Sequence, residues 1–483
     1  MNNTQYVPLG GGIDLVTPPR MLKPGACLYA INYECPVTGG YRRIDGYTKL
    51  GGTLPGTGPV LGVATFKDEH YAIREDGASA TLYHLDAGTW TSVGTLPVGR
   101  YEFAEGNFLA TAAGRGLYFV GGDKPYQFKG GVLTEIADAA AGARFIEVHA
   151  NYLWLGFPEG SLQYSQVGEP LAWDGSLGAG EIGTGQALMG LVTGTGGVLH
   201  AACRDSIQAI YGTSASNFER RVTIPSSGAK PYSVQSMLQP YFVAERGIAN
   251  LQSTQEFGDF RQLQVGASTE PLFTKDNWAN RIQCSGVSKS RAHYRVFIED
   301  GSGIYLSPTG ATTVKFPDKP QVMHSGEFDS GEEVTLFGDD AGNVYRLGNG
   351  AESFNGQPIT AFLTLAYNDL NNPSSRKRFR RVFWDIRSGS NASITFKPDF
   401  DFGGSNSADA LRQTLSFLLG GDLWDVGKWG EFVWSSPIMA QEPSDITGSG
   451  TAINFAIYSN SISQPHEVLG YDLTFTQRRL RRG

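Results

Sequence analysis

The chain has 483 residues and a mass of 52.1 kDa, so it is long enough for two or three domains or for one large unit built from repeats. Its 40% hydrophobic and 18% charged residues are typical of a globular protein and exclude a disordered one. A net charge of −8 argues against a dedicated nucleic-acid binder, because such proteins usually carry a basic domain. The 63 glycines and many aromatic residues favour short strands joined by tight turns, so a β-rich protein is expected.

Targeting signals are not expected. The first residues lack a basic stretch followed by an apolar one, which argues against a secretory signal, and no run approaches the ~18 apolar residues of a membrane span. The cysteines Cys27, Cys35, Cys203 and Cys284 include no CxxC pair. Only Cys27 and Cys35 are near enough to share a hairpin, where they could form a disulfide or stay reduced, as in a protein assembled in the cytoplasm.

Residues 1–55 are rich in turns and are expected to run as an extended N-terminal arm with one or two short strands. Beyond this arm one pattern recurs, in which an acidic or Gly-containing turn precedes a short strand with an aliphatic–aromatic pair. Copies are about 35–50 residues apart, with one wider gap around residues 240–265 that is filled by 243–252 and 261–266. Clear copies span residues 75–85, 299–306 and 339–347, and weaker ones span 121–128, 158–165 and 204–212.

Repeats of this length predict an all-β fold built around a β-propeller of about seven blades over residues 56–356. Most copies follow a second apolar strand, so each repeat contains a strand, a turn and a strand. One four-stranded blade cannot bury both of its faces alone. Blades arranged radially cover one another and leave only short edges exposed.

Residues 357–483 are expected to form a β-sandwich-like C-terminal β-domain, because their strand patterns are longer than those of the repeats. Within this domain, the segment 408–421 has apolar residues at helical spacing and ends in two glycines. It predicts a short helix, with a bent strand as the alternative. The predicted strands span residues 359–367, 378–387, 392–400, 453–459 and 468–479.

No motif predicts catalysis. The phosphate-binding loop, the HExxH zinc motif and the GxSxG nucleophile motif are absent, and no two of the 7 histidines have metal-ligand spacing. Asp399 and Asp401 fall on one face of a predicted strand, either as a Ca²⁺ site or as solvent-facing carboxylates, and the EF-hand pattern fails there. The sequence therefore predicts a non-enzymatic protein with no catalytic, cofactor-binding or metal site and no cofactor.

A glycan-binding or glycan-cleaving propeller stays open as an alternative. The segment 85–90 is similar to the Asp-box turn of sialidases, although its spacing is one residue short and no second copy is found. A structural turn is the competing interpretation, and paired catalytic carboxylates cannot be identified from a sequence alone.

Basic residues are concentrated in the C-terminal part of the chain. The first group is predicted to lie on a strand, and strand alternation places Arg376, Arg378 and Arg380 on one face and Lys377 and Arg381 on the other. This strand is interpreted either as a solvated, charge-protected edge or as a subunit interface, with phosphate binding as a third reading. A second candidate contact lies at the C-terminus and consists of Arg478, Arg479, Arg481 and Arg482.

The N-terminal sequence resembles the start of the tail nozzle, or tail hub, proteins of short-tailed bacteriophages. Members open with a Pro-Gly turn, an Asn-Tyr-Glu-like strand and a Gly-Tyr-Arg-Arg-Ile-x-Gly-Tyr segment. The later strand 376–382 is similar to the start of their post-propeller β-domain, and the order of arm, propeller and β-domain also agrees. The matching N-terminal residues are Pro24, Gly25, Asn32, Tyr33, Glu34, Gly40, Tyr41, Arg42, Arg43, Ile44, Gly46 and Tyr47.

This resemblance implies a structural virion protein that forms a hexameric ring at the distal end of the tail. Such a ring joins the head-to-tail adaptor protein, carries tail fibre or spike proteins, and closes a channel around packaged DNA until DNA ejection. Assembly in the host cytoplasm follows from the same resemblance. An acidic protein is compatible with a lumen that does not grip DNA, since it makes few phosphate contacts. A tail-tip or fibre-attachment protein of a long-tailed phage is a further alternative.

Overall fold

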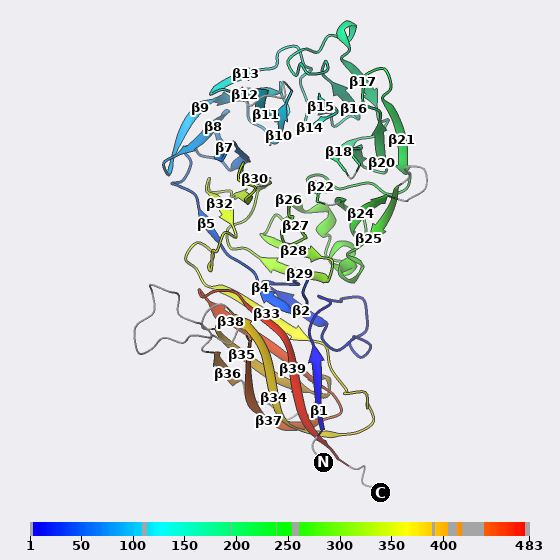
Figure 1. Ribbon diagram of the computed structural model, residues 1–483, viewed down its shortest axis with the longest axis vertical. Helices are drawn as coiled ribbons and strands as arrows, with labels where there is room; N and C mark the ends of the chain where they lie inside the picture. Colours follow the sequence, from blue (N-terminus) through cyan, green and yellow to red (C-terminus); the bar gives the residue numbers. More distant parts are fainter. Residues whose placement is uncertain are drawn as a thin grey trace. The chain divides into compact units, whose positions relative to one another are not determined.

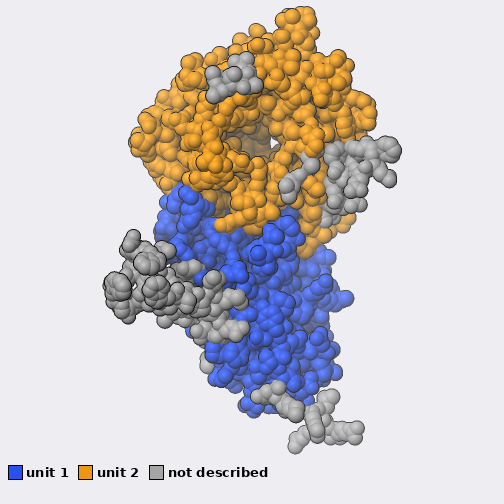
Figure 2. Space-filling model, viewed as in Figure 1, with its two compact units in different colours: residues 1–48, 302–315, 348–483 blue, residues 49–301, 316–347 orange. Residues whose placement is uncertain are grey.

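The described residues of the computed structural model fall into two compact units (Figures 1 and 2). Unit 1 comprises residues 1–48, 302–315 and 348–483, and unit 2 comprises 49–301 and 316–347. The expected boundaries after residues 55 and 356 fall near these changes of unit, but residues 1–48 group with the C-terminal part and do not form a separate arm. The structure describes residues 3–108, 114–194, 196–237, 239–253, 260–388, 392–403, 413–417 and 439–478.

Unit 2 is a β-propeller whose first five sheets each use four consecutive strands (Figure 1). The sixth blade begins with β26 (Ile282–Ser288) and β27 (His293–Ile298). The seventh blade contains β30 (Val322–Glu327), β31 (Glu333–Gly338) and β32 (Val344–Leu347). The first five blades are β6–β9 (Val60–Phe66, Glu69–Asp76, Ser79–Asp86, Thr89–Leu96), β10–β13 (Glu102–Asn107, Arg115–Val120, Tyr126–Lys129, Val132–Glu135), β14–β17 (Phe145–His149, Tyr152–Gly156, Ser161–Tyr164, Gly180–Gly183), β18–β21 (Leu188–Thr193, Leu199–Cys203, Ile207–Tyr211, Glu219–Ile224) and β22–β25 (Gln235–Ser236, Pro240–Ala244, Gly247–Ser253, Phe260–Gln264).

The repeated sequence pattern corresponds to the hairpin between the second and third strands of a blade. In the first blade Asp76 pairs with Ser79, and Gly77 at the turn has a φ of 67°, which a residue without a Cβ adopts at little cost. In the fifth blade the residues that fill the wide gap form the equivalent hairpin, with Ala244 paired to Gly247. The propeller and its approximate blade number are therefore confirmed, and the repeat is visible because each hairpin is local in sequence.

The ring of unit 2 is closed by its own first residues. The amide of Leu50 donates to the Val344 carbonyl at 2.8 Å, and the amide of Val60 donates to the Asp339 carbonyl at 3.0 Å. A shared hydrophobic cluster joins β6–β9 to β30–β32 and includes Leu54 and the buried Trp90. The first and last blades are thus held together by both hydrogen bonds and apolar packing, and Figure 2 shows a hollow at the centre of the ring.

Neighbouring blades are joined by apolar faces. The first and second blades share a cluster that contains Phe66, Tyr71 and Phe119, and the third and fourth share one built around Trp154 and Leu199. Full burial of one such large side chain contributes about 1.5–3 kcal/mol, so several contacts per interface stabilise a ring that no blade could form alone.

Unit 1 contains two facing sheets with an aromatic core. Trp384 and Tyr471 from one sheet pack against Phe396 and Phe455 from the other, with the Trp384 and Phe455 ring centroids 5.1 Å apart. One sheet has the order β3-β4-β39-β34-β37 with β1 on β39, and the other includes β29-β2-β33-β38-β35-β36. The strands of unit 1 are β1 (Asn3–Pro8), β2 (Cys27–Ile31), β3 (Tyr33–Glu34), β4 (Tyr41–Arg43), β28 (Ser302–Ser307), β29 (Gly310–Lys315), β33 (Ile359–Leu365), β34 (Lys377–Ser388), β35 (Ala392–Phe400), β36 (Gln413–Phe417), β37 (Met439–Gly450), β38 (Ile453–Ser461) and β39 (His466–Gln477).

Several local expectations are corrected by the structure. The helix expected over 408–421 is wrong where that segment is described, because Gln413–Phe417 is β36 and pairs with β35, while 408–412 and 418–421 lie outside the described residues. The expected one or two strands of residues 1–55 are five, β1 to β4 and β5 (Tyr47–Lys49), because these short strands pair mainly with partners distant in sequence. All four cysteines are buried free thiols, so Cys27 and Cys35 form no disulfide.

Helical structure is sparse in the part of the chain that the structure describes. None of its helices is both long and apolar enough to cross a membrane. The strand β5 (Tyr47–Lys49) carries the chain from unit 1 into unit 2. The helical segments are α1 (Glu270–Thr274) and the short turns η2 (Gly175–Leu177), η3 (Ala267–Thr269), η4 (Trp278–Asn280) and η5 (Asp401–Gly403).

Candidate functional site

The N-terminal motif residues form a buried polar network inside unit 1. Arg42 on β4 donates to Glu34 at 2.7 Å and to Asp45 at 2.6 Å, and Glu34 is only 2% exposed. Burial acts to lower the pKa of Arg42, but these two carboxylates outweigh it and the pKa is raised. Buried charges that are paired and hydrogen-bonded hold a fold in one register, so this network is an internal part of the structure.

Arg43 links distant parts of unit 1. Its guanidinium is fully buried and donates to the carbonyl and hydroxyl of Ser461 at 2.7 Å each, to the Glu352 carbonyl at 3.2 Å and to the Ser463 carbonyl. The neighbouring Tyr33 hydroxyl lies 3.0 Å from Nε2 of His466. Burial, with Arg43 and Arg42 adding to it, lowers the pKa of His466 to about 3, so this imidazole is neutral at physiological pH.

The remaining motif residues shape the backbone. Pro24 and Gly25 occupy the centre of a turn closed by the Ala26 amide and the Lys23 carbonyl, and a Cβ on Gly25 (φ 96°) would lie 2.2 Å from the Pro8 carbonyl oxygen.

Four further motif positions also shape the backbone. The Tyr41 hydroxyl donates to the Gly25 carbonyl at 2.9 Å. A Cβ on Gly46 would lie 1.8 Å from the Ser353 carbonyl oxygen, and one on Gly40 (φ 81°) would lie 2.9 Å from that of Val468. Asn32 has a φ of 57° and its side chain donates to the Thr360 carbonyl at 2.8 Å. All of these contacts stay within unit 1.

The arginine-bearing strand is β34, and the interpretation as an edge strand is wrong, because β34 pairs with both β37 and β39. Its alternation also differs from the prediction. A β-bulge between Phe379 and Arg381 places both Arg380 and Arg381 on the exposed side, because the extra residue shifts the register by one. Arg381 is paired with Asp445 at 2.8 Å. Arg378 and Arg380 are exposed, and neither forms an ion pair with any residue that the structure describes.

Two other members of the basic group form hydrogen bonds within unit 1. Lys377 is fully buried, and its ammonium donates to the carbonyls of Asn372, Ser375 and Thr451, so it is not available to a partner. Arg376 is exposed and donates to the Ser449 carbonyl at 3.2 Å.

The C-terminal basic group is described only at its first member. The Arg478 side chain is exposed, and its amide donates to the Arg376 carbonyl. Arg479, Arg481 and Arg482 lie outside the described residues.

The carboxylates once considered for Ca²⁺ have other partners. Asp399 accepts from the Tyr367 hydroxyl at 2.6 Å, and Asp401 accepts from the Thr451 amide at 2.6 Å and its hydroxyl at 2.8 Å. These bonds tie η5 to the turn between β37 and β38. Among the described residues, no group of three or more His, Cys, Asp or Glu side chains is arranged to hold a metal ion.

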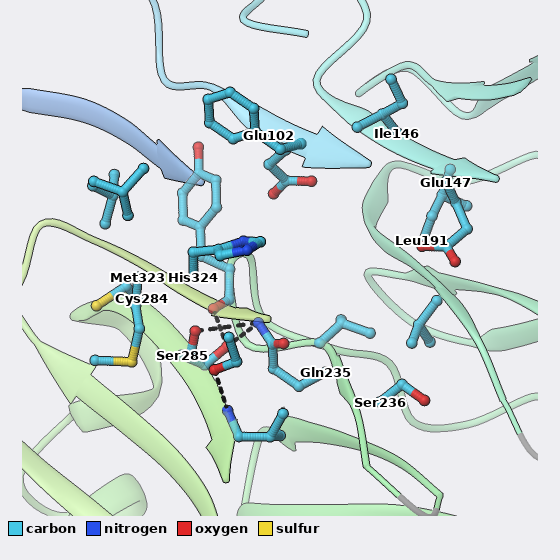
Figure 3. Close-up of a pocket in the computed structure, with 18 of the residues that line it drawn as sticks. Glu102, Ile146, Glu147, Leu191, Gln235, Ser236, Cys284, Ser285, Met323 and His324 are labelled. Carbon is cyan, nitrogen blue, oxygen red and sulfur yellow. Dashed lines mark hydrogen bonds between the residues drawn. The ribbon is translucent and has the colours of Figure 1, made fainter. Parts of the chain in front are cut away.

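The propeller channel contains a cavity of about 340 Å³, which sequence reasoning did not find (Figure 3). The first strand of every blade contributes to its wall, so residues far apart in sequence converge on it. One representative from each of these strands is Val63, Glu102, Glu147, Leu191, Ser236, Ser285 and His324.

Two carboxylates and an imidazole face this cavity. Figure 3 shows the side chains of Glu102, Glu147 and His324 directed into the open space. Burial raises the pKa of each of the two glutamates to about 7; for Glu102, Arg100 lowers and Glu147 raises it further. Burial, with His70 adding to it, lowers the pKa of His324 to about 4. Near neutral pH the imidazole is uncharged, while the glutamates are only partly ionised.

The sequence carried a weak signal for these glutamates. Glu102 lies between Tyr101 and Phe103, and Glu147 lies between Ile146 and Val148, so each acidic residue interrupts an apolar strand. Such a residue is a candidate buried carboxylate. Their convergence depends on which strand of each blade lies innermost, and the repeat pattern alone does not specify this.

Comparison with known proteins finds similarity only in fold. No family model and no curated protein sequence matches the chain. A streptogramin B lyase structure is 13% identical with a TM-score of 0.44, covering 62% of this chain and 97% of that one. The virginiamycin B lyase of Staphylococcus aureus is 12% identical (62% and 98% covered, TM-score 0.43), and the WD40 β-propeller domain of Doa1 is 11% identical (63% and 97% covered, TM-score 0.43). What they share with this chain is the β-propeller fold.

Proposed function

We propose that this chain is a structural, non-catalytic subunit of the ring at the distal end of a short bacteriophage tail, the tail nozzle. The observation that carries this proposal is the use of the family-like motif in unit 1. Arg42, Arg43, Asn32, Gly25 and Gly46 each make a contact that the local fold requires. A resemblance in residues that determine a fold is a resemblance in architecture, whereas one confined to exposed residues would have no structural consequence.

The unpaired arginines of β34 support assembly into a ring. Arg378 and Arg380 are exposed beside each other on one strand and have no acidic partner among the described residues of their own chain. Guanidinium groups form bidentate pairs with carboxylates, so these two residues suit an acidic surface of a neighbouring copy. The expected assembly is a homo-oligomer, with a hexamer as the family-like number.

The wider role follows from the same resemblance. The ring would bind the head-to-tail adaptor protein and tail fibre or spike proteins, and its lumen would hold packaged DNA without sequence-specific contacts until ejection. The net charge of −8 favours this, because an acidic surface makes few phosphate contacts that would retain the DNA. The chain would be assembled in the host cytoplasm and located in the virion tail.

The proposal is tested by imaging the purified chain by electron microscopy, alone and with its adaptor. Rings of uniform subunit number are expected, and particles that lack the chain should have incomplete tails. Monomers under both conditions would contradict the proposal. A position beside a long tail tube would instead identify a tail-tip or fibre-attachment protein of a long-tailed phage.

The arginine interface has its own test. Arg378→Glu combined with Arg380→Glu should abolish ring formation while the monomer stays folded. Lys275→Glu combined with Lys319→Glu is the matched control, since both lysines are exposed in unit 2 and the charge change is the same. Rings formed normally by the arginine variant would mean that Arg378 and Arg380 are solvated surface charges of β34 with no role between subunits.

A glycan-binding or glycan-cleaving propeller is the second candidate, and the observation that favours it is the pair of cavity carboxylates Glu102 and Glu147. Two carboxyl groups, one of them protonated near neutral pH, are the catalytic groups of most glycosidases. A glycan array and a glycosidase panel test this candidate. Turnover that is lost in Glu102→Gln or Glu147→Gln would replace the structural proposal.

A further inference from the structure

We propose that the cavity in the propeller channel is a binding site for a small organic cation, a primary alkylammonium or a diamine, held between Glu102 and Glu147. This inference rests on the wall of the cavity in unit 2 and does not depend on a role in a phage tail.

The two carboxylates lack a charged partner. Glu102 begins β10 and Glu147 lies within β14, so adjacent blades bring them to the same cavity (Figure 3). Among the residues described, neither glutamate takes part in a salt bridge, in contrast to Glu34 in unit 1. Moving a carboxylate out of bulk water is costly unless a cation or hydrogen-bond donors compensate it. Glu147 accepts hydrogen bonds from Thr193, which act to lower its pKa, yet burial still raises that pKa to about 7. A bound ammonium group would supply the positive charge and further donors.

Several hydrogen-bond donors of the wall already have partners in the protein. The hydroxyls of Ser236, Ser285 and Tyr101 donate to the backbone carbonyls of Thr193, Tyr232 and Pro97 at 2.9, 2.7 and 2.7 Å. The Gln235 amide nitrogen donates to the carbonyl and hydroxyl of Ser285, both at 3.2 Å.

This arrangement leaves mainly hydrogen-bond acceptors on the cavity wall for a ligand. With its nitrogen held by Ser285, the Gln235 amide keeps its oxygen on the opposite side of the group. The carboxylates of Glu102 and Glu147 and a neutral imidazole on His324 add further acceptor atoms. A wall that offers mainly acceptors selects a ligand rich in donors, and an alkylammonium group carries three N–H donors and a positive charge.

The cationic side chains of the cavity wall already interact with other residues of the protein. Arg100 donates to the Gln321 carbonyl at 2.9 Å and stacks on Tyr232, with its guanidinium carbon 3.8 Å from the ring centroid. Lys289 is paired with Glu327 at 2.7 Å. Arg100 acts to lower the pKa of Glu102 but forms no salt bridge with it.

The size of the cavity limits the ligand. About 340 Å³ is at the lower end of the range for small-molecule sites, which favours a ligand of a few carbon atoms over an oligosaccharide. Apolar side chains such as Val63, Ile146 and Leu191 complete the wall and suit the methylene chain of an alkylamine.

Binding should depend on pH through a short list of groups. The titratable groups that line the cavity with the two glutamates are Arg100, Tyr101, Tyr232, Cys284, Lys289 and His324. Between pH 5.5 and 8, taken as test conditions, burial keeps the pKa of His324 below the range, at about 4, whereas the raised pKa values of the two glutamates, about 7, lie within it. The glutamates are therefore the groups that change charge in this range, and amine binding should strengthen as the pH rises from 5.5 to 8.

Isothermal titration calorimetry of the full chain tests the proposal with 1,4-diaminobutane, butylamine and the uncharged 1,4-butanediol at pH 8. The expected order of affinity is diamine, then monoamine, with the diol at least ~100-fold weaker than the diamine. Glu102→Gln combined with Glu147→Gln should weaken diamine binding at least ~10-fold, and so should a change to pH 5.5 for the original chain. Glu159→Gln, an exposed site in the same unit, is the control and should bind as the original chain does.

Three results would overturn the proposal. They are no heat from either amine with a chain shown to be folded by circular dichroism, binding of the diol as tight as that of the diamine, and unchanged binding by the double variant. Cleavage of a glycoside that requires Glu147 would also overturn it, because the carboxylates would then serve glycan hydrolysis. Ring formation is measured separately, so failure of the tail proposal leaves this test unaffected.

Discussion

Buried charge is handled differently in the two units. In unit 1 Glu34 and Asp45 are paired with Arg42, and Arg43 donates hydrogen bonds to three residues distant in sequence. In unit 2 Glu102 and Glu147 lie in a cavity with no ion-pair partner among the described residues. A paired buried charge serves the fold, whereas an unpaired one costs stability and is more readily explained by a ligand. The comparison therefore separates structural residues from candidate functional ones.

The largest effect is expected from Arg43→Met. The substitution keeps an apolar stem but removes every guanidinium donor, so the carbonyls of Ser461, Glu352 and Ser463 lose their partner while buried. Breaking a buried charged network in this way costs about 3–5 kcal/mol. Hydrogen exchange followed by mass spectrometry should show faster exchange in β4 and β39 of unit 1.

Arg378→Met is the control for that measurement, because it removes the same charge from an exposed position of unit 1. If Arg43→Met left exchange in β4 and β39 as slow as in the control, the network would not hold unit 1 together, and the contrast between the units would fail.

His466 gives unit 1 a predicted sensitivity to acid. Because burial lowers the pKa of this residue to about 3, the unfolded chain binds a proton below about pH 6.5 that the folded chain does not. The stability that neutral His466 provides is present above pH 6.5 and is lost as the pH falls toward 3. Between pH 6.5 and 5 the loss should be on the order of 2 kcal/mol.

Urea unfolding monitored by exchange in β39 measures this slope. His466→Gln should flatten it, while His84→Gln, a half-buried site in unit 2, should leave it unchanged. An equally steep slope in His466→Gln would assign the acid sensitivity to other groups.

The cavity glutamates should show the opposite sign. Their folded pKa values, raised to about 7, mean that the folded chain holds protons that the unfolded chain has released. Their contribution to stability is therefore full below pH 4.5 and is lost as the pH rises to about 7. Without ligand, Glu102→Gln and Glu147→Gln should each stabilise unit 2 at pH 8, by on the order of 1 kcal/mol once partial access to water is allowed for.

Exchange rates in β11 and β15, measured at pH 5 and pH 8, test this expectation. The stabilisation by the two glutamine substitutions should be small at pH 5 and larger at pH 8, and Glu159→Gln should not stabilise unit 2 at either pH. Equal stability of the glutamine variants and the original chain at pH 8 would mean that these carboxylates are compensated within the protein.

Sequence reasoning succeeded where the structure is local. The hairpins of the propeller are formed by neighbouring residues and carry a turn signal such as Gly77, so the fold of unit 2 was predictable. Unit 1 depends on distant pairing, such as Asn3 with Phe475 in β1 and β39, which no short pattern encodes. The same limit hid the cavity, because Glu102 and Glu147 meet only once the blades are placed in a ring.

The arginine strand shows how one residue changes such a prediction. Simple alternation predicts Arg381 and Lys377 on the same face of the strand. The bulge instead turns Arg381 to the exposed side, so that Lys377 is the buried member of the basic group. Burial lowers the pKa of that lysine, and three backbone carbonyls accept its hydrogen bonds. A bulge is a tertiary feature, since it depends on the partner strand, and so the sequence of β34 alone did not reveal it.

The smallest effect on the monomer is expected from Arg378→Ala. This side chain is exposed and has no ion pair among the described residues, so its loss should change the free energy of unfolding by no more than about 0.5 kcal/mol. Lys377→Met, one residue earlier, should cost about 2 kcal/mol, because three buried carbonyls lose their donor. Urea titrations of both variants give the two values. A cost above about 1 kcal/mol for Arg378→Ala would show that this arginine has a partner within its own chain, and the case for an intersubunit role would then rest on Arg380 alone.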